Sequence, residues 1–151
     1  MGLFQSFDIC ASGLTAQRFR MDIIAENIAN VNTTRTEDGT PYRRKIVTFE
    51  EKELNTGVAS FKNVLNKTKA AYNGNGVKVS KVSEDYDTDY IMEYDPSHPD
   101  ADENGYVSYP NVNTVTEMTN LIDASRSYEA NTTAFQALKS MASSGISIGQ
   151  R

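Results

Sequence analysis

Apolar side chains recur every three or four positions from Leu3 to Val31 with hardly a break, which is the spacing of one face of an α-helix. A helix over this stretch would be about 43 Å long, which exceeds the diameter of a small domain. We therefore expect it to find a partner outside a compact core. The positions of this face are Leu3, Phe7, Cys10, Leu14, Gln17, Met21, Ile24, Ile28 and Val31.

The same segment carries apolar residues on a second side, at Ile9, Ala16, Phe19 and Ile23. A two-stranded coiled coil needs only one narrow stripe. The second face therefore predicts further neighbours, either from a larger bundle or from other copies in an assembly.

The end of the chain repeats this design. No Pro or Gly interrupts the sequence from Thr114 to Ser143, so a continuous helix of about 30 residues is expected there. Its many small side chains let neighbouring helices approach closely, but alone in water such a helix would be marginal. Its apolar face consists of Leu121, Ala124, Tyr128, Asn131, Phe135, Leu138 and Ala142, widened by Met118 and Ile122.

The middle of the chain differs, because all four prolines lie between Gly39 and Pro110. Alternating runs that begin at Arg43, Gly76 and Asp89 predict strands, and NGNG before Val77 predicts a hairpin turn. The expected fold class is α+β, with long N- and C-terminal helices that pair as an antiparallel coiled coil and a small β-rich central insert. The expected segments are 1–34, 35–110 and 111–151.

Composition narrows the function classes. The net charge of −5 argues against nucleic-acid binding, and Arg43–Lys45 is interpreted as a solvated strand edge. No run approaches the roughly 18 uncharged apolar residues that span a bilayer, so no membrane insertion is expected. The first 17 residues carry no Lys or Arg and do not resemble a cleavable signal peptide.

No constellation of residues indicates catalysis. The single histidine, His98, lies between two prolines, no nucleotide-binding motif is present, and the acidic residues are scattered. We expect no enzyme, no cofactor and no catalytic residue. One alternative from another class is a small calcium-binding module, because Asp100, Asp102 and Asn104 precede a glycine as in a calcium loop. That match fails at Asn111, where a glutamate should close the site.

Asparagines stand at notable positions of both predicted helices. ENIANVNT, Glu26–Thr33, ends the first helix, and Asn131 lies within the last. An asparagine carries two donors and two acceptor lone pairs on a short side chain, and it also suits a helix exit. We hypothesise that Asn27, Asn30 and Asn131 bind buried backbone groups between crowded helices.

Two segments closely resemble the terminal signatures of bacterial flagellar axial proteins, the rod, hook and hook-associated subunits. They are LTAQRFRMDIIAENIANVNTT, residues 14–34, and GYVSYPNVNTVTEMTNLIDASRSYEANTTAF, residues 105–135. The elements NIANVNT and SRSYEAN mark the broad family. The short chain and GYVSYPNVNTVTEM favour a proximal rod subunit, and another axial subunit is the alternative.

The resemblance implies a structural protein. In this family the terminal helices pair, and many copies pack into a helical tube that transmits torque from the inner-membrane ring toward the hook. The implied partners are other copies, neighbouring rod subunits, basal-body ring and adaptor proteins, and the flagellar type III export apparatus. The implied location is the periplasm-spanning rod of the basal body, reached without a cleavable signal peptide. The expected packing residues are Phe7, Leu14, Met21, Ile24, Ile28, Leu121, Tyr128, Phe135 and Leu138, with polar contacts from Asn27, Asn30 and Asn131.

Overall fold

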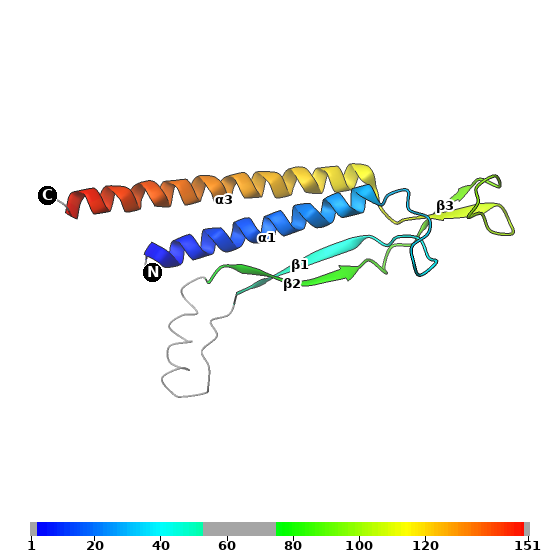
Figure 1. The fold of residues 1–151 in the computed structure, drawn as a ribbon, viewed down its shortest axis with the longest axis horizontal. Coiled ribbons are helices and arrows are strands. Elements are labelled where there is room, and N and C mark those ends of the chain that lie inside the picture. The colour runs from blue at the N-terminus through cyan, green and yellow to red at the C-terminus, as the bar shows by residue number, and fades with distance from the viewer. Residues whose placement is uncertain (1–2, 53–74, 150–151) are drawn as a thin grey trace, which may run out of the picture. The chain divides into compact units, whose positions relative to one another are not determined.

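A computed structural model of the chain describes residues 3–52 and 75–149 (Figure 1). Two long helices lie at the two ends of this sequence, and four short strands lie between them. In chain order the elements are α1 (Leu3–Ala29), β1 (Lys45–Glu51), β2 (Val77–Glu84), β3 (Ile91–Tyr94), β4 (Tyr106–Tyr109) and α3 (Thr114–Gly149). The prediction of an α+β fold with long terminal helices and a small β-rich insert is confirmed.

Helix α1 ends at Ala29, and the side chain of the next residue, Asn30, adds a hydrogen bond to one of the last carbonyls. The backbone amide of Asn30 donates to the carbonyl of Glu26 at 3.1 Å, and Asn30 Nδ2 donates to the same oxygen at 2.9 Å. The chain then turns at residues 30–32. The polar stretch after Ala29 therefore leaves the helix before Thr34.

Helix α3 begins with an asparagine cap and runs further than its composition suggests. Asn113 Oδ1 accepts hydrogen bonds from the amides of Val115 and Thr116 at 3.0 and 3.1 Å, which satisfies two free donors of the first turn. The helix was expected to extend to Ser143, but it continues through Gly145 to Gly149. An isolated glycine lowers helix stability by only about 1 kcal/mol and does not end a helix by itself.

The strands form two separate two-stranded sheets, β1 with β2 and β3 with β4. In the first sheet, the Asp85 amide donates to Arg44 at one end and the Lys52 amide donates to Gly76 at the other, which is an antiparallel order. In the second, Ile91 pairs with Tyr109 and Tyr94 with Tyr106. Strand β4 was not predicted.

The hairpin turn predicted at NGNG falls partly outside the described residues, since Asn73 and Gly74 are not among them. Gly76, its last residue, accepts a hydrogen bond from the Lys52 amide at 2.9 Å. Gly76 therefore takes part in the pairing between the β1 and β2 sides of the sheet.

The chain divides into two compact units, and each draws on both helices. Unit 1 comprises residues 1–18, 49–80 and 126–151, and unit 2 comprises residues 19–48 and 81–125. Unit 2 holds most of the buried apolar residues, namely Ile24, Tyr42, Val107, Val112 and Ala124, whereas Ala16 is the one in unit 1 among the described residues. The predicted segments 1–34, 35–110 and 111–151 stay a prediction about domain organisation.

Part of the second apolar face of α1 is covered by the chain's own insert. In unit 1, Ser12 Oγ accepts a hydrogen bond from the Val77 amide at 3.0 Å, so the start of β2 lies against α1. On that side Ala16 is buried.

Within residues 3–52 and 75–149, no helix combines the length and the hydropathy that a membrane-spanning helix needs.

Candidate functional site: helix faces and a buried polar network

The helix face predicted from the apolar spacing is the face that the structure turns inward. Ile24 and Asn27 are buried, and the other ten predicted residues are half-buried. These ten are Phe7, Leu14, Met21, Ile28, Asn30, Leu121, Tyr128, Asn131, Phe135 and Leu138. Their role in assembly stays a prediction.

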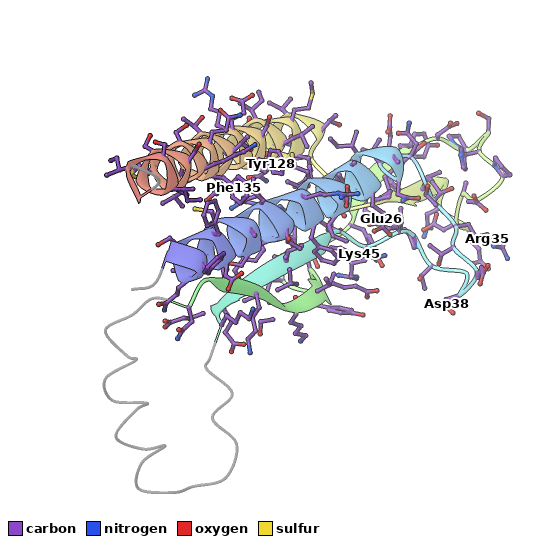
Figure 2. All side chains as sticks on the ribbon, turned by 60° about the vertical axis from the view of Figure 1, so that its left-hand side comes forward. Glu26, Arg35, Asp38, Lys45, Tyr128 and Phe135 are labelled. Atoms are coloured by element: carbon purple, nitrogen blue, oxygen red, sulfur yellow. The ribbon has the colours of Figure 1, made fainter. Side chains whose placement is uncertain are left out.

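Two contacts show how the helices meet within unit 1. The rings of Phe7 and Phe135 contact edge to face, with centroids 5.1 Å apart. Further along, a Cβ added to Gly13 would lie 2.9 Å from Asn131 Oδ1, so the glycine makes room for the asparagine. Residue numbers rise on α1 as they fall on α3, which is an antiparallel arrangement. Figure 2 shows Tyr128 and Phe135 pointing from α3 toward α1.

Asn27 is the centre of a buried polar network in unit 2. Its Oδ1 accepts hydrogen bonds from the Tyr42 hydroxyl and the Lys45 amide, both at 2.9 Å. Its Nδ2 donates to the Lys45 carbonyl at 2.9 Å and to Glu117 Oε2 at 3.1 Å. Both donors and both acceptor positions of the side chain are therefore filled, as a residue that is 1% exposed requires.

Glu117 connects this asparagine to a guanidinium. The carboxylate is 1% exposed, and its Oε1 accepts hydrogen bonds from Arg44 Nη2 at 2.7 Å and Arg44 Nε at 2.9 Å. Arg44 Nη1 lies 3.5 Å from Asp85 Oδ2. One arginine thus pairs with two carboxylates that are buried, and pairing of this kind is what allows a buried charge to be tolerated.

Asn111 and Asp85 complete the network. Asn111 Oδ1 accepts from the Arg44 amide at 2.8 Å, and its Nδ2 donates to the carbonyls of Asp85 and Thr88. Burial alone would raise the pKa of Asp85. Hydrogen bonds from Thr88, the Asp87 amide and Arg44 outweigh burial, so the pKa of Asp85 lies below its ordinary value.

Tyr42 stays a hydrogen-bond donor at every ordinary pH. Burial is the main cause that raises the pKa of its hydroxyl, and the charges of Glu26, Glu117 and Glu84 raise the pKa further. The neutral hydroxyl can therefore always donate to Asn27. The network joins the end of α1, the start of β1 and the first turn of α3, and all of its members belong to unit 2.

The three predicted asparagines behave differently. Asn27 binds the backbone of Lys45 on another element. Asn30 Nδ2 binds the Glu26 carbonyl of its own helix, and Asn131 Nδ2 binds the Ser127 carbonyl of its own helix at 2.9 Å.

Sequence reasoning missed Tyr42, Arg44, Asp85, Asn111 and Glu117. Only Glu117 could have been found from the sequence. It lies four residues before Leu121, so it places a charged side chain on the same helix face as the apolar residues of α3. A carboxylate on an otherwise apolar face predicts a buried partner. The others lie in loops or at a strand entry, where no periodicity marks them.

The interpretation of Arg43–Lys45 as a solvated strand edge is wrong. Arg44 binds buried carboxylates, and the guanidinium of Arg43 stacks between the rings of Tyr86 and Tyr90 at 4.5 and 4.4 Å. Lys45 forms an ion pair with Glu26, and Figure 2 shows the two side chains facing each other from β1 and α1. Local composition cannot reveal such partners, because they come from distant parts of the chain.

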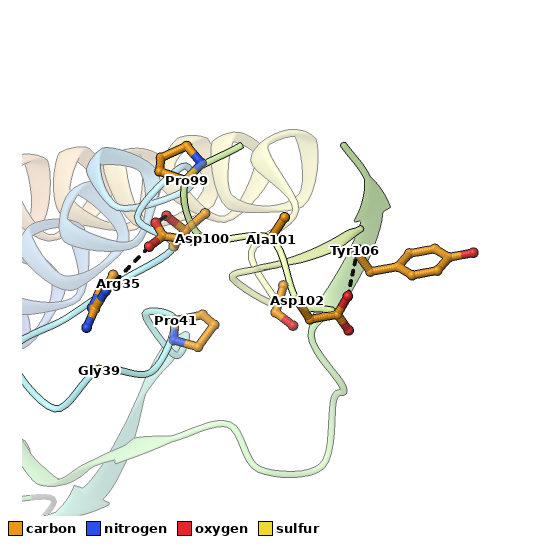
Figure 3. Close-up of a pocket in the computed structure, with 10 residues that line it drawn as sticks. Arg35, Gly39, Pro41, Pro99, Asp100, Ala101, Asp102 and Tyr106 are labelled. Atoms are coloured by element: carbon orange, nitrogen blue, oxygen red, sulfur yellow. Dashed lines mark hydrogen bonds and ion pairs between the residues drawn. The ribbon is translucent and has the colours of Figure 1, made fainter. Parts of the chain in front are cut away.

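The loop that suggested calcium binding lines a pocket of about 390 Å³ in unit 2 (Figure 3). Asp100 points toward Arg35, 3.7 Å away, and accepts from the Thr34 hydroxyl at 2.8 Å. Asp102 Oδ1 instead accepts from the amides of Asn104 and Tyr106. The two carboxylates are directed apart and do not converge on one ion position. Within residues 3–52 and 75–149, no group of three or more acidic, His or Cys side chains could hold a metal.

Comparison with known proteins assigns the chain to a family. Residues 7–35 match the family model described as flagella basal body rod protein, and residues 103–148 match the model of the flagellar basal body rod FlgEFG protein C-terminal region. The flagellar basal-body rod protein FlgC of Bacillus subtilis is 45% identical, over 99% of this chain and 100% of the relative. The FlgC proteins of Borreliella burgdorferi and Escherichia coli O6:H1 are 44% and 40% identical, each over 99% of this chain and over 99% and 100% of their own lengths. This chain belongs to the FlgC family of flagellar basal-body rod proteins.

Proposed function

We propose that this chain is a structural subunit of the proximal rod, in which many copies and related subunits polymerise into a helical tube that transmits torque toward the hook. Its relatives are named as rod proteins, and family membership agrees with the expectation of a protein without enzymatic activity. The finer assignment to the proximal rod and to torque transmission is the proposal.

The observation that best supports the proposal is the buried polar network of unit 2. A subunit that carries torque has to resist bending where its helices join the rest of the chain. Charge-assisted hydrogen bonds fix the geometry of their partners, and a fully satisfied buried polar network makes a core rigid. Asn27, Arg44 and Glu117 place such contacts where α1, β1 and α3 meet.

Packing surfaces that remain exposed also support an assembled state. In unit 2, Val115, Met118 and Ile122 recur at helical spacing on α3 and are 53–74% exposed. Exposed apolar stripes of this kind mark protein contacts. The proposed partners are other copies, neighbouring rod subunits, and ring and adaptor proteins of the basal body. The proposed route is the flagellar type III export apparatus.

A deletion in the source bacterium tests this function. Removing the gene should abolish swimming in soft agar and the assembly of hook and filament, and the wild-type gene should restore both. Mass spectrometry of isolated basal bodies should detect the chain. Normal motility after deletion, or basal bodies that lack the chain in motile cells, would contradict the proposal.

A further inference from the structure

The small sheet of β3 and β4 turns one face inward and exposes the other. Across the two strands, Met92 pairs with Ser108 and Tyr94 pairs with Tyr106. Because side chains alternate along a strand, these four residues share one face, which we call the tyrosine face. The opposite face carries Val107, which is 0% exposed. On the tyrosine face, Met92 is 56% exposed, Tyr94 65% and Tyr106 43%, so this face is available to a partner.

The two tyrosines of this face present aromatic rings to the outside. Their rings contact edge to face, with centroids 5.3 Å apart, and Figure 3 shows the Tyr106 ring directed away from the neighbouring pocket. The face of a tyrosine ring attracts the positive charge of Lys or Arg. Unit 2 already contains a contact of this kind, because the Arg43 guanidinium lies 4.5 and 4.4 Å from the ring centroids of Tyr86 and Tyr90.

Unit 2 is strongly acidic around these strands. From Val82 to Ser125 the sequence contains eleven Asp or Glu residues and neither Lys nor Arg. The whole of unit 2 has 15 acidic and six basic residues, which gives it a net charge of −9. A surface with such a field attracts positively charged partners.

Several carboxylates lie next to the tyrosine face itself. Asp95 follows Tyr94 in the chain, and Asp102 Oδ1 accepts a hydrogen bond from the Tyr106 amide at 2.9 Å. Four carboxylates of this hairpin form no ion pair with another residue that the structure describes. They are Glu93, Asp95, Asp102 and Glu103.

This charge selects the class of partner. Nucleic acids and anionic lipid surfaces are repelled by a unit of charge −9. A second copy of the chain carries a net charge of −5 and is repelled at long range. A purely apolar partner would remove water from the carboxylates without replacing its hydrogen bonds. A protein segment that carries Lys or Arg complements both the rings and the carboxylates.

We propose that the tyrosine face binds a cationic segment of a different protein of the basal body. A Lys or Arg side chain of that segment lies over the rings of Tyr94 and Tyr106, and its apolar stem packs on Met92. The neighbouring carboxylates pair with further positive charges of the same segment. This inference rests on the proposed function and states the chemistry of one partner.

Photo-cross-linking in assembled basal bodies tests the contact. One form of the full chain carries benzoylphenylalanine in place of Met92, on the tyrosine face. The matched control carries it in place of Glu93, the next residue of the same strand, whose side chain belongs to the opposite face. Both forms are expressed in cells that lack the native gene. After irradiation, the first form should give an adduct with a different protein in several times the yield of the control, and the attached segment should contain Lys or Arg.

Second substitutions in the first form separate a cationic partner from an apolar one. Tyr94→Phe keeps the aromatic ring and should leave the adduct yield unchanged. Tyr94→Leu keeps an apolar side chain but removes the ring, and it should lower the yield about three- to tenfold, as expected for one cation–π contact.

A charge reversal covers the case in which Tyr94→Leu disturbs the fold. Glu103 lies on an exposed turn, so Glu103→Lys should leave the fold intact and lower the yield several-fold. The control Glu37→Lys makes the same charge change at another exposed position of unit 2 and should leave the yield nearly unchanged.

The outcomes separate this inference from the proposed function. If the chain is present in basal bodies and the yield at Met92 does not exceed that at Glu93, the contact is wrong while the rod function stands. An adduct with a second copy, or equal yields for Tyr94→Leu and Tyr94→Phe, also overturns the inference. If the wild-type chain is absent from basal bodies, the proposed function fails, and this inference fails with it.

Discussion

At the scale of single residues, Asn27 carries the clearest prediction. Asn27→Ala removes four hydrogen bonds, which join Asn27 to the Tyr42 hydroxyl, the two backbone groups of Lys45 and Glu117 Oε2. We expect the free energy of unfolding to fall by about 3 kcal/mol or more, since each unsatisfied buried group costs about 1–3 kcal/mol. Urea unfolding followed by circular dichroism measures this. The control Asn30→Ala loses only the local hydrogen bonds to the Glu26 carbonyl and from the Thr33 hydroxyl, and it should lower stability by less than about 1 kcal/mol. Equal effects of the two substitutions would contradict the importance of the network.

Asp85 makes stability depend on pH at the acidic end. Its pKa in the folded chain lies below the unfolded value of about 3.9. The stabilisation by Asp85 is therefore complete above about pH 4 and is lost as the pH falls through the lower folded-state pKa. Urea midpoints measured from pH 6 down to pH 2.5 should decline over this range. Asp85→Asn should flatten the decline; an unchanged slope would show that other carboxylates cause it.

Among the glycines of residues 3–52 and 75–149, Gly76 is the one where an added side chain would meet the closest neighbour. Its φ is +90°, and an added Cβ would lie 2.2 Å from Ser12 Oγ. Gly39 has a similar φ of +77°, but its Cβ would meet nothing within 4 Å. Gly39→Ala should therefore cost only the backbone strain of about 1 kcal/mol, whereas Gly76→Ala should cost distinctly more. Thermal unfolding of both variants checks the difference, and equal losses would show that Ser12 moves away freely.

At the scale of elements, the pairing of α1 with α3 in unit 1 can be measured through one aromatic pair. Phe7 and Phe135 contact edge to face at 5.1 Å, a geometry that contributes about 0.5–1.5 kcal/mol beyond burial. A double-mutant cycle of Phe7→Ala and Phe135→Ala should give a coupling of that size. The control cycle pairs Phe7→Ala with Met141→Ala, which is 60% exposed and should be additive. No coupling in the first cycle would show that the helices are unpaired in solution.

At the scale of the whole molecule, the two units should differ in resistance before assembly. Unit 1 has little buried apolar surface among its described residues, whereas unit 2 holds the polar network and most of the core. Limited trypsin digestion of the dilute chain should therefore cut after Arg18, Arg126 and Lys139 before it cuts after Arg44. Mass spectrometry of early fragments gives the order. Early cutting at Arg44 would contradict the prediction, and uniform resistance would show that unit 1 folds fully without partners.

Much of the fold can be predicted from patterns among residues that are close together in the sequence. The spacing of Phe7, Leu14, Ile24 and Ile28 can be read from the sequence because helical periodicity depends on neighbouring residues, and these side chains are buried or half-buried in the structure. The strands that begin near residues 43, 76 and 89 were also found. Strand β4 was missed, since its four residues, Tyr106–Tyr109, are too few for alternation to be read.

The sequence by itself determined that this chain has two long amphipathic helices, a small β insert and membership in a family of flagellar axial proteins. Periodicity and motifs are contained in neighbouring residues, so they need no knowledge of distant contacts. Only the tertiary structure decided which polar residues are buried together. Glu117 and Arg44 are 73 positions apart, and their partnership depends on two elements meeting in space. From the sequence alone, a charged residue is expected to be exposed to solvent. Which oppositely charged residue it meets in the interior is decided by how the elements pack.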